Sequence, residues 1–336
     1  MSQSGSQANT PLRAAVIGVG YLGRFHAQKY QLIDGVELVG VADADPKRAE
    51  QIGQELGVAG YADYRDLLDK VDLVSIATIT ECHFKVAEAC LNAGIHVLIE
   101  KPITVTLEEA DELIDIADRN NLFIQVGHLK RFHPAVAALR NSGILRSPRY
   151  IEAERLAPFK PRALDVDVVL DLMIHDVDLI LNFVGSEVAK VEAMGTPVLT
   201  NQVDIANARL TFANGCIADV RASRVSLQAT RKMRLFQPDA YVALDFITKG
   251  IRVVMKGEGD MQLEGVTVPA LEEKRLTIED YDTLETEIRS FCESVRDGRQ
   301  PLVTGRDGRK ALAVVAQVRD SLMRYIDEQG LTPPKK

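Results

Sequence analysis

The feature that most constrains the fold is a glycine-rich segment, Ile17-Gly18-Val19-Gly20-Tyr21-Leu22-Gly23, between an apolar run and a stretch of helical character. Three glycines at this spacing, where a strand turns into a helix, are typical of a βαβ unit. The first glycine allows a tight turn, the second lets backbone N–H groups approach a ligand, and the third lets the helix pack closely on the strand. Because the helix N-terminus is partly positive, the segment predicts a site for the pyrophosphate of a dinucleotide.

An acidic residue stands where such a site needs one. Asp43 follows the apolar run Val36–Val41, about 20 residues beyond Gly23. Its carboxylate is expected to accept hydrogen bonds from a ribose hydroxyl and to repel a 2′-phosphate, which favours NAD over NADP. Lys47 and Arg48 could instead bind a 2′-phosphate, so NADP remains an alternative. A second alternative is that the glycines only form a turn and that no dinucleotide binds.

The first third of the chain alternates short apolar runs with helical stretches, which is the pattern of a doubly wound α/β domain. The predicted strands are Ala14–Ile17, Val36–Val41, Leu73–Ala77, His96–Ile99 and Phe123–Val126. A capping box, Thr106 with Glu109, marks the start of a helix over Leu107–Asn120. We therefore expect a flexible tail over residues 1–11 and a Rossmann domain with a parallel sheet over residues 12–127.

The remainder, residues 128–330, predicts an α+β domain with an open, mostly antiparallel sheet, followed by a tail at 331–336. Polar and apolar residues alternate on either side of Asn214-Gly215, which indicates a hairpin. A three-residue loop with Gly215 left-handed keeps the apolar sides in register, pairing Leu210 with Ala218. The further predicted elements are strands at Lys232–Phe236, Tyr241–Ile247 and Ile251–Met255, and helices at Thr283–Val295 and Arg306–Asp327, the last capped by Thr304. Whether the last helix packs back on the first domain is left open.

The composition limits the classes of ligand that the protein is expected to bind. A net charge of -8 and a pI near 5.4 argue against nucleic acid and anionic membranes, so small molecules are the expected ligands. Without an apolar run long enough for export or membrane insertion, the sequence predicts a cytoplasmic protein. The four cysteines lack metal-like spacing and are expected to be thiols, and no zinc motif is present.

The chemistry is expected from the second domain and from one turn of the first. On a helix, Asp171 and His175 are four residues apart and share a face, where a carboxylate can orient an imidazole for acid–base work. Lys101, in Glu100-Lys101-Pro102 after a buried strand, lies at the sheet edge where such folds bind ligands, and its ammonium can stabilise alkoxide-like charge. A surface Asp/His pair and a lysine that only reaches solvent are the structural alternatives.

These motifs, together with Ser75–Thr80 and His83, resemble those of the glucose-fructose oxidoreductase/inositol dehydrogenase/MocA family over nearly the whole chain. The resemblance implies a Rossmann domain before an open antiparallel sheet, with Lys101, Asp171 and His175 at the substrate site. Ile79 and Met173 depart from the proline and glycine common in the family. The cofactor contacts it implies beyond the glycine segment and Asp43 are Ala77, Thr78, Thr80, His83, Glu100 and Lys101.

Three further segments are similar to family members that oxidise the 3-hydroxyl of UDP-N-acetylglucosamine: Val126–Phe132, Asp165–Val169 and Arg234–Tyr241. Physical support comes from a local excess of basic residues in an acidic chain, some of which could hold a diphosphate: Arg155, Lys160, Arg162, Arg221, Arg224, Arg231, Lys232 and Arg234. Solvated outer faces of strands are the alternative. The residues predicted to contact substrate are His128, Arg131, Arg155, Arg162, Asp167 and Arg224.

The sequence thus predicts an NAD-dependent dehydrogenase of a sugar nucleotide. Alternatives are a dehydrogenase or reductase of a free sugar, inositol or other polyol, a reductase of an unsaturated ligand or imine, and a non-catalytic dinucleotide sensor. Apolar residues on both sides of Lys232–Phe236 and Tyr241–Ile247 further predict a homodimer or homotetramer that associates through the second sheet.

Overall fold

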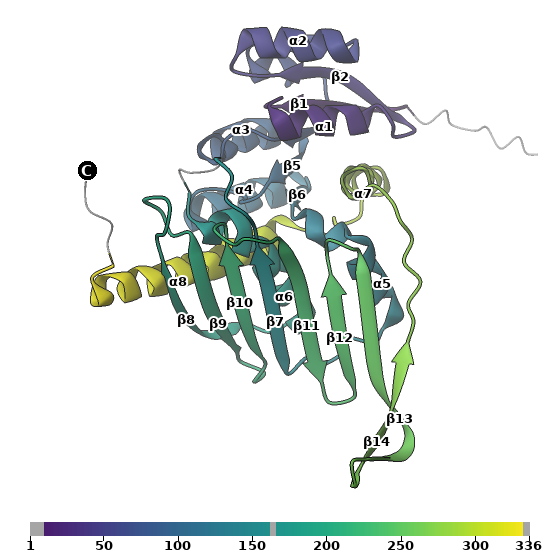
Figure 1. Cartoon of the computed structure of the whole chain (residues 1–336). Helices are drawn as coiled ribbons and strands as arrows, with labels where there is room; N and C mark the ends of the chain where they lie inside the picture. Colours follow the sequence, from purple (N-terminus) through teal and green to yellow (C-terminus); the bar gives the residue numbers. More distant parts are fainter. Residues whose placement is uncertain (1–9, 162–165, 332–336) are drawn as a thin grey trace, which may run out of the picture. The chain divides into compact units, whose positions relative to one another are not determined.

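The computed structural model describes residues 10–161 and 166–331, which form two compact units (Figure 1). The first unit contains the chain up to Leu129 together with Asp282–Arg309, and the second contains Lys130–Tyr281 and the chain from Lys310 onward. The expected single boundary near residue 128 is therefore corrected. Residues 282–309 belong to the first unit because the helix they contain buries Phe291 and Cys292 in that unit's core.

The first unit is a doubly wound domain. Its six strands pair in the order β3-β2-β1-β4-β5-β6, all parallel, so the expected Rossmann arrangement is confirmed. The strands are β1 (Leu12–Ile17), β2 (Val36–Ala42), β3 (Ala59–Tyr61), β4 (Leu73–Ile76), β5 (His96–Glu100) and β6 (Ile124–Gly127). The helices are α1 (Tyr21–Tyr30), α2 (Pro46–Leu56), α3 (Thr80–Asn92), α4 (Leu107–Asn120) and α7 (Thr283–Asp297), with short 3-10 turns at Tyr64–Leu67 and Leu129–Phe132.

Local sequence signals set several of these boundaries. The capping box of α4 forms as predicted: the Thr106 hydroxyl accepts from the Glu109 N–H at 3.2 Å, and the Glu109 carboxylate accepts from the Thr106 N–H at 3.2 Å. Thr304 likewise precedes the last helix and exchanges hydrogen bonds with Asp307. These pairs satisfy N–H groups that a helix start leaves without partners.

The second unit is built on an eight-stranded sheet in the order β14-β13-β12-β11-β7-β10-β9-β8, antiparallel except for the parallel pair β7 and β10. Its strands are β7 (Tyr150–Leu156), β8 (Val188–Thr196), β9 (Ile205–Phe212), β10 (Ile217–Ser223), β11 (Thr230–Gln237), β12 (Ala240–Asp245), β13 (Gly250–Leu263) and β14 (Val266–Lys274). Helices α5 (Pro134–Ser142), α6 (Ile174–Val184) and α8 (Gly305–Gln329) complete the described elements, with a π-helical turn at Val169–Met173 before α6.

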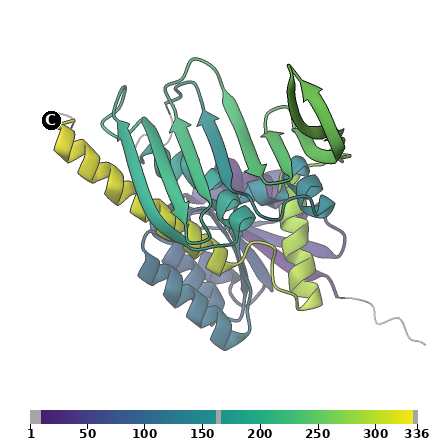
Figure 2. The ribbon, with the colours of Figure 1, turned by 90° about the horizontal axis from the view of Figure 1, so that it is seen from below.

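One face of this sheet carries the core. Apolar side chains of α8, among them Val315 and Leu322, pack with those of the strands, and Figure 2 shows α8 lying along the sheet. The predicted hairpin register is confirmed, because Leu210 pairs with Ala218 and Gly215 has a φ of +82°. The alternation of β9 and β10 sets this register by placing every second side chain in the core.

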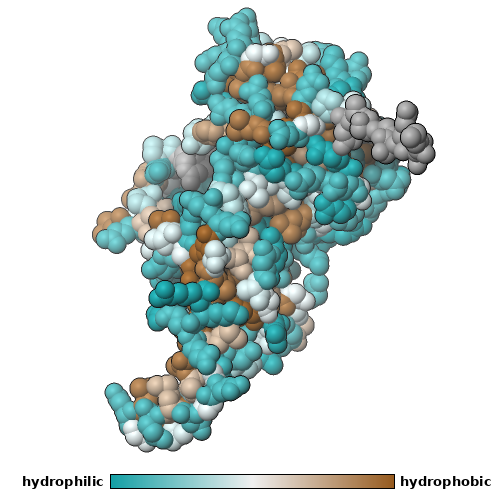
Figure 3. Space-filling view, turned by 90° about the vertical axis from the view of Figure 1, so that its right-hand side faces the viewer, coloured by the Kyte–Doolittle hydropathy of each residue, from teal (hydrophilic) through white to brown (hydrophobic). Residues whose placement is uncertain are grey.

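The other face of the sheet is not the apolar surface that the sequence suggested. On β11, Met233 and Leu235 are buried, whereas Lys232, Arg234 and Phe236 point away from the core. Beyond the sheet, β13 and β14 continue as a two-stranded ribbon with exposed apolar residues at its tip, visible at the foot of Figure 3. The exposed apolar residues of this ribbon are Met261, Leu263, Val266 and Leu271.

His133 begins α5 and predicts a measurable pH dependence. It is 3% exposed, and its Nδ1 accepts from the Ala135 N–H at 3.3 Å, which requires that nitrogen to be unprotonated. Burial, with the nearby charge of Lys130, lowers the pKa of His133 to about 4. Between about pH 6.5 and 4 the unfolded chain therefore binds a proton that the folded chain does not, so stability falls as the pH falls.

We expect this histidine to reduce the free energy of unfolding by about 2 kcal/mol between pH 7 and pH 5. His133→Asn keeps an N-cap acceptor without titrating, so urea unfolding followed by circular dichroism should show a smaller pH difference in the variant. An unchanged pH difference would show that His133 titrates normally in the folded protein.

Candidate active site

The glycine segment follows β1, next to β4, where the strand order of the sheet reverses. It packs against the loop that follows β4. Gly18 has a φ of +87°, and a Cβ on it would lie 2.8 Å from the backbone of Ala77. A Cβ on Gly23 would lie 1.8 Å from the Gly18 carbonyl oxygen. Both glycines are therefore required by close packing, at the sheet edge where doubly wound folds bind ligands.

Gly20 differs from these two. Within the described part of the chain, a Cβ on Gly20 would have no heavy atom within 4 Å. Gly20 is the N-cap of α1, and among residues 10–161 and 166–331 no side chain caps this helix and no acidic residue lies in its first turn. Open space in front of uncapped N–H groups fits the pyrophosphate of a dinucleotide.

Asp43 lies next to this loop at the end of β2, 8% exposed. Its Oδ2 accepts from the Val19 N–H at 2.9 Å, and its Oδ1 accepts from the Asp45 N–H at 2.9 Å. Arg48 approaches the same carboxylate at 3.2 Å. Asp43 is thus held in one position beside the glycine loop, and its contact with a ribose stays a prediction. Arg48 is the cation that the structure places at this carboxylate.

His83 has a different place from the one expected. Its ring is 1% exposed, with Nδ1 2.9 Å from the Pro102 carbonyl oxygen and Nε2 3.2 Å from that of Thr78. Burial lowers the pKa of His83 despite these carbonyl contacts. The ring therefore ties the loop after β4 to the turn after β5. Ile79, between Thr78 and Thr80, has a φ of -68°, which is the value proline requires, so the departure at this position leaves the backbone intact.

The Glu100 carboxylate also contacts other protein groups, although it was predicted to contact the cofactor. Its Oε1 lies 3.2 Å from His26 Nε2, and its Oε2 accepts from the Lys101 N–H at 3.2 Å. Burial raises the pKa of Glu100, but the hydrogen bond from His26 and the charge of Lys101 lower it by more, so the net shift is downward. Sequence reasoning missed His26. The available signal was a histidine on the sheet-facing side of α1, with Gly23 and Tyr30.

Asp171 and His175 lie in the second unit. Asp171 is in the π-helical turn and His175 in the first turn of α6, which corrects the expectation of one regular helix. Within 167–180 every residue is buried except Leu170, Asp171 and His175, so the two titratable residues share the accessible side. Such π-turns are frequent at functional sites. Met173, by contrast, is fully buried in the core.

Two of the arginines predicted to bind substrate instead fix α6. Arg155 is 3% exposed and makes a bidentate pair with Asp176, both contacts at 2.7 Å. Arg131 is 4% exposed and pairs in the same way with Asp178 at 2.7 and 2.8 Å. Because these guanidinium groups are buried against carboxylates, the structure does not support either as a substrate ligand.

Two of the other predicted substrate contacts, Arg224 and Asp167, are also bound to protein groups. Arg224 is 5% exposed and donates to buried Asp204 at 2.7 Å. Asp167 accepts from the Val169 and Leu170 N–H groups, each at 3.0 Å, and from Arg319 at 2.7 Å. His128 is 1% exposed in the first unit. Arg162 lies outside the described residues.

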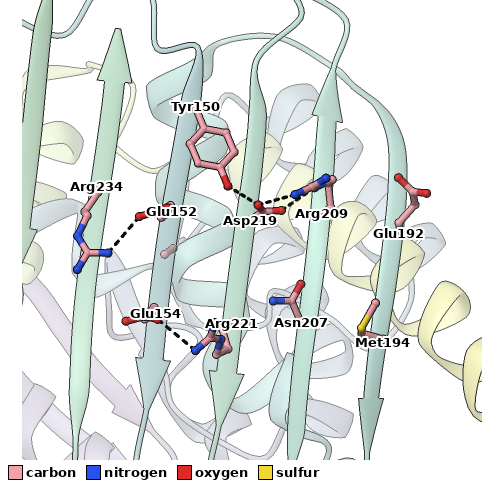
Figure 4. Close-up of a pocket in the computed structure, with 11 residues that line it drawn as sticks. Tyr150, Glu152, Glu154, Glu192, Met194, Asn207, Arg209, Asp219, Arg221 and Arg234 are labelled. Atoms are coloured by element: carbon pink, nitrogen blue, oxygen red, sulfur yellow. Dashed lines mark hydrogen bonds and ion pairs between the residues drawn. The ribbon is translucent and has the colours of Figure 1, made fainter.

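Several of the remaining basic residues line a hollow on the outer face of the sheet (Figure 4). Arg221 pairs with Glu154 at 3.3 Å, and Arg234 pairs with Glu152 at 3.1 Å. Arg209 pairs with Asp219 at 2.8 Å. The alternative interpretation of the basic cluster, outward faces of strands, therefore holds for these residues.

Metal-binding clusters and membrane-spanning helices are both absent from the described residues. Across 10–161 and 166–331, no group of three or more His, Cys, Asp or Glu residues is placed to hold a metal ion. Within the same residues, no helix is both long and apolar enough to cross a bilayer. The four cysteines are free thiols, of which Cys82 is exposed and the others are buried.

Comparison with known proteins identifies the fold family. Residues 12–128 match the model of an oxidoreductase family with an NAD-binding Rossmann fold, and residues 136–239 match the GFO/IDH/MocA C-terminal domain. The chain belongs to the Gfo/Idh/MocA oxidoreductase family. The predicted family, fold class, NAD cofactor and dehydrogenase class are thereby confirmed.

Relatives within the family differ in substrate. UDP-N-acetylglucosamine 3-dehydrogenase from Acidithiobacillus ferrooxidans is 42% identical over 315 residues, which cover 94% of this chain and 98% of that protein. A solved structure of that dehydrogenase superposes with a TM-score of 0.88, covering 94% and 98% of the two chains at 43% identity. The scyllo-inositol 2-dehydrogenase (NAD(+)) of Bacillus subtilis is 29% identical, covering 88% of this chain and 90% of that protein.

The position of Asp43 predicts cofactor selectivity. We expect NAD to bind at least about tenfold more tightly than NADP, a difference of about 1.4 kcal/mol, because the carboxylate repels a 2′-phosphate. Calorimetry with both cofactors measures the ratio. Asp43→Asn should reduce it, since Arg48 then faces the phosphate without a competing charge, and Arg48→Ala should not. Equal affinities in the unmodified protein would contradict the assignment of Asp43.

Proposed function

We propose that this chain is an NAD-dependent dehydrogenase that oxidises the 3-hydroxyl of UDP-N-acetylglucosamine. The observation that carries the proposal is the 42% identity to a UDP-N-acetylglucosamine 3-dehydrogenase over nearly the full length of both chains. The uncapped N-terminus of α1 and the half-buried pair Asp171 and His175 support it. We place the reaction in the cytoplasm, since charged nucleotides do not cross a bilayer unaided.

The proposed chemistry needs a hydride acceptor, a base and a group that stabilises negative charge. NAD supplies the hydride acceptor, and the protein must remove the hydroxyl proton. We assign that role to His175, whose imidazole can take the proton near neutral pH. Asp171, on the same accessible side, orients the ring. Lys101 would donate a hydrogen bond to the substrate oxygen and stabilise the negative charge that develops on it as the hydride leaves.

The activity test uses NAD with UDP-N-acetylglucosamine, monitored by NADH absorbance and by mass spectrometry of the 3-keto product. His175→Ala should lower kcat by roughly 10²-fold or more with NAD affinity nearly unchanged, because loss of a general base acts on the chemical step. Lys101→Ala should lower kcat at least as much through lost charge stabilisation.

Met173→Leu, a conservative change in the buried core beside these residues, serves as the matched control and should keep near-normal activity. Full activity of both alanine variants on the true substrate would refute the catalytic assignment. Turnover of free polyols without turnover of the UDP sugar would refute the substrate and retain the family chemistry.

Polyol oxidation is the second candidate. Myo-inositol 2-dehydrogenase of Thermotoga maritima is 26% identical over 329 residues, and the B. subtilis scyllo-inositol enzyme is also similar. A competition assay with both inositols and the UDP sugar separates the candidates by kcat/KM.

We also propose that the chain forms a homodimer or homotetramer through the outer face of the eight-stranded sheet. This face carries charged residues of both signs (Figure 4). It also carries an aromatic group of Tyr150, Phe236 and Tyr241 with ring centroids 5.1 to 6.0 Å apart. A surface with both charge signs and an aromatic group can be complementary to a second copy of itself.

Light scattering at micromolar concentration should show a dimer or tetramer. Phe236→Asp should reduce the assembly, because it puts a charge into the aromatic group. Met323→Asp, at an exposed position of α8, should not. A monomeric unmodified protein would contradict this proposal.

A further inference from the structure

A chain of buried polar groups crosses the first unit and ends at the backbone of Lys101. Tyr30 Oη lies 2.8 Å from Ser75 Oγ, which lies 3.1 Å from His26 Nδ1. His26 Nε2 lies 3.2 Å from Glu100 Oε1, and Glu100 Oε2 accepts from the Lys101 N–H at 3.2 Å. Tyr30, Ser75 and His26 are 0% exposed.

The Glu100 carboxylate is confined on three sides. His26 Nε2 lies 3.2 Å from one oxygen, the Lys101 N–H donates to the other, and β6 closes the third side at Gly127. A Cβ on Gly127 would lie 2.9 Å from Glu100 Cδ and from Oε1. The carboxylate therefore fits only because residue 127 is a glycine, and its position fixes the direction of the Lys101 N–H.

Burying a histidine and a carboxylate is expensive, and apolar side chains of similar size are often as stable or more so. The pair nevertheless forms a polar path from α1 to the backbone of Lys101. Since α1 starts at the glycine loop, His26 connects the helix that would hold the cofactor phosphates to the residue after β5. Small displacements of a catalytic group can cost orders of magnitude in rate.

We propose that His26 is a positioning residue for Lys101, acting through Glu100. His26 holds the carboxylate against the Lys101 N–H, and the carboxylate in turn holds the turn that carries the lysine side chain. The catalytic consequence rests on the proposed role of Lys101, whereas the link from His26 to the Lys101 backbone does not.

The test compares four single variants and one double variant by kcat, by KM for NAD and by hydrogen exchange of the Lys101 amide in the protein without cofactor. His26→Leu should lower kcat by about tenfold with KM for NAD within about twofold, and should speed exchange at Lys101 more than in the rest of β5. His26→Gln keeps an N–H donor and should restore most of both readouts. Gly127→Ala should resemble His26→Leu, because its methyl group displaces the carboxylate.

Tyr30→Phe is the matched control in the same polar chain. It removes the bond to Ser75 but leaves the contact between His26 and Glu100, so it should lower the melting temperature without a local change at Lys101. Combining His26→Leu with Gly127→Ala should lower kcat by less than the product of the single effects, since both act on one carboxylate.

Normal kcat and normal Lys101 exchange in folded His26→Leu would overturn the proposal. So would uniform acceleration of exchange along β5 in both His26→Leu and Tyr30→Phe, which is what a purely structural role predicts. If His26→Leu does not fold, Gly127→Ala decides by the same readouts. Full activity of Lys101→Ala would instead remove the proposed function, while exchange at Lys101 would still test the link to His26.

Discussion

The close approach of α1 to β1 is the constraint on which the first unit depends. No side chain fits at Gly23, because its Cβ would overlap the Gly18 carbonyl, so the helix lies against the strand and the loop between them stays tight. This contact leaves the uncapped N-terminus of α1 at the carboxyl edge of the sheet, where a phosphate can be bound. It also brings His26, three residues and less than one turn further along, within reach of Glu100.

Buried ion pairs position the candidate pair Asp171 and His175 in the second unit. Arg155 and Arg131 each make a bidentate pair with an aspartate of α6, one residue and three residues after His175. Such pairs add little net stability once desolvation is counted, but breaking one leaves a buried charge and is strongly unfavourable. Their effect is to fix the rotation of α6, which leaves Asp171 and His175 on the accessible side.

Sequence reasoning succeeded where the signal was local. The glycine spacing, the capping box of α4 and the alternation around Gly215 each depend on residues a few positions apart, and the structure reproduces all three. It failed for the arginines predicted to bind substrate, because the sequence does not show whether a basic side chain points into the core or to the outer face of its strand. Arg155 points into the core and Arg221 to the outer face, and only strand pairing separates them.

The sequence by itself determined the doubly wound domain, the dinucleotide loop, the family and the candidate catalytic residues, because periodicity and short motifs act through neighbouring atoms. The tertiary structure alone decided the return of Asp282–Arg309 to the first unit, the parallel pairing of β7 with β10 and the contact of His26 with Glu100. Each of these joins segments far apart in the chain. Such contacts depend on how buried surfaces pack and how buried charges pair across the whole fold. A local sequence pattern does not determine them.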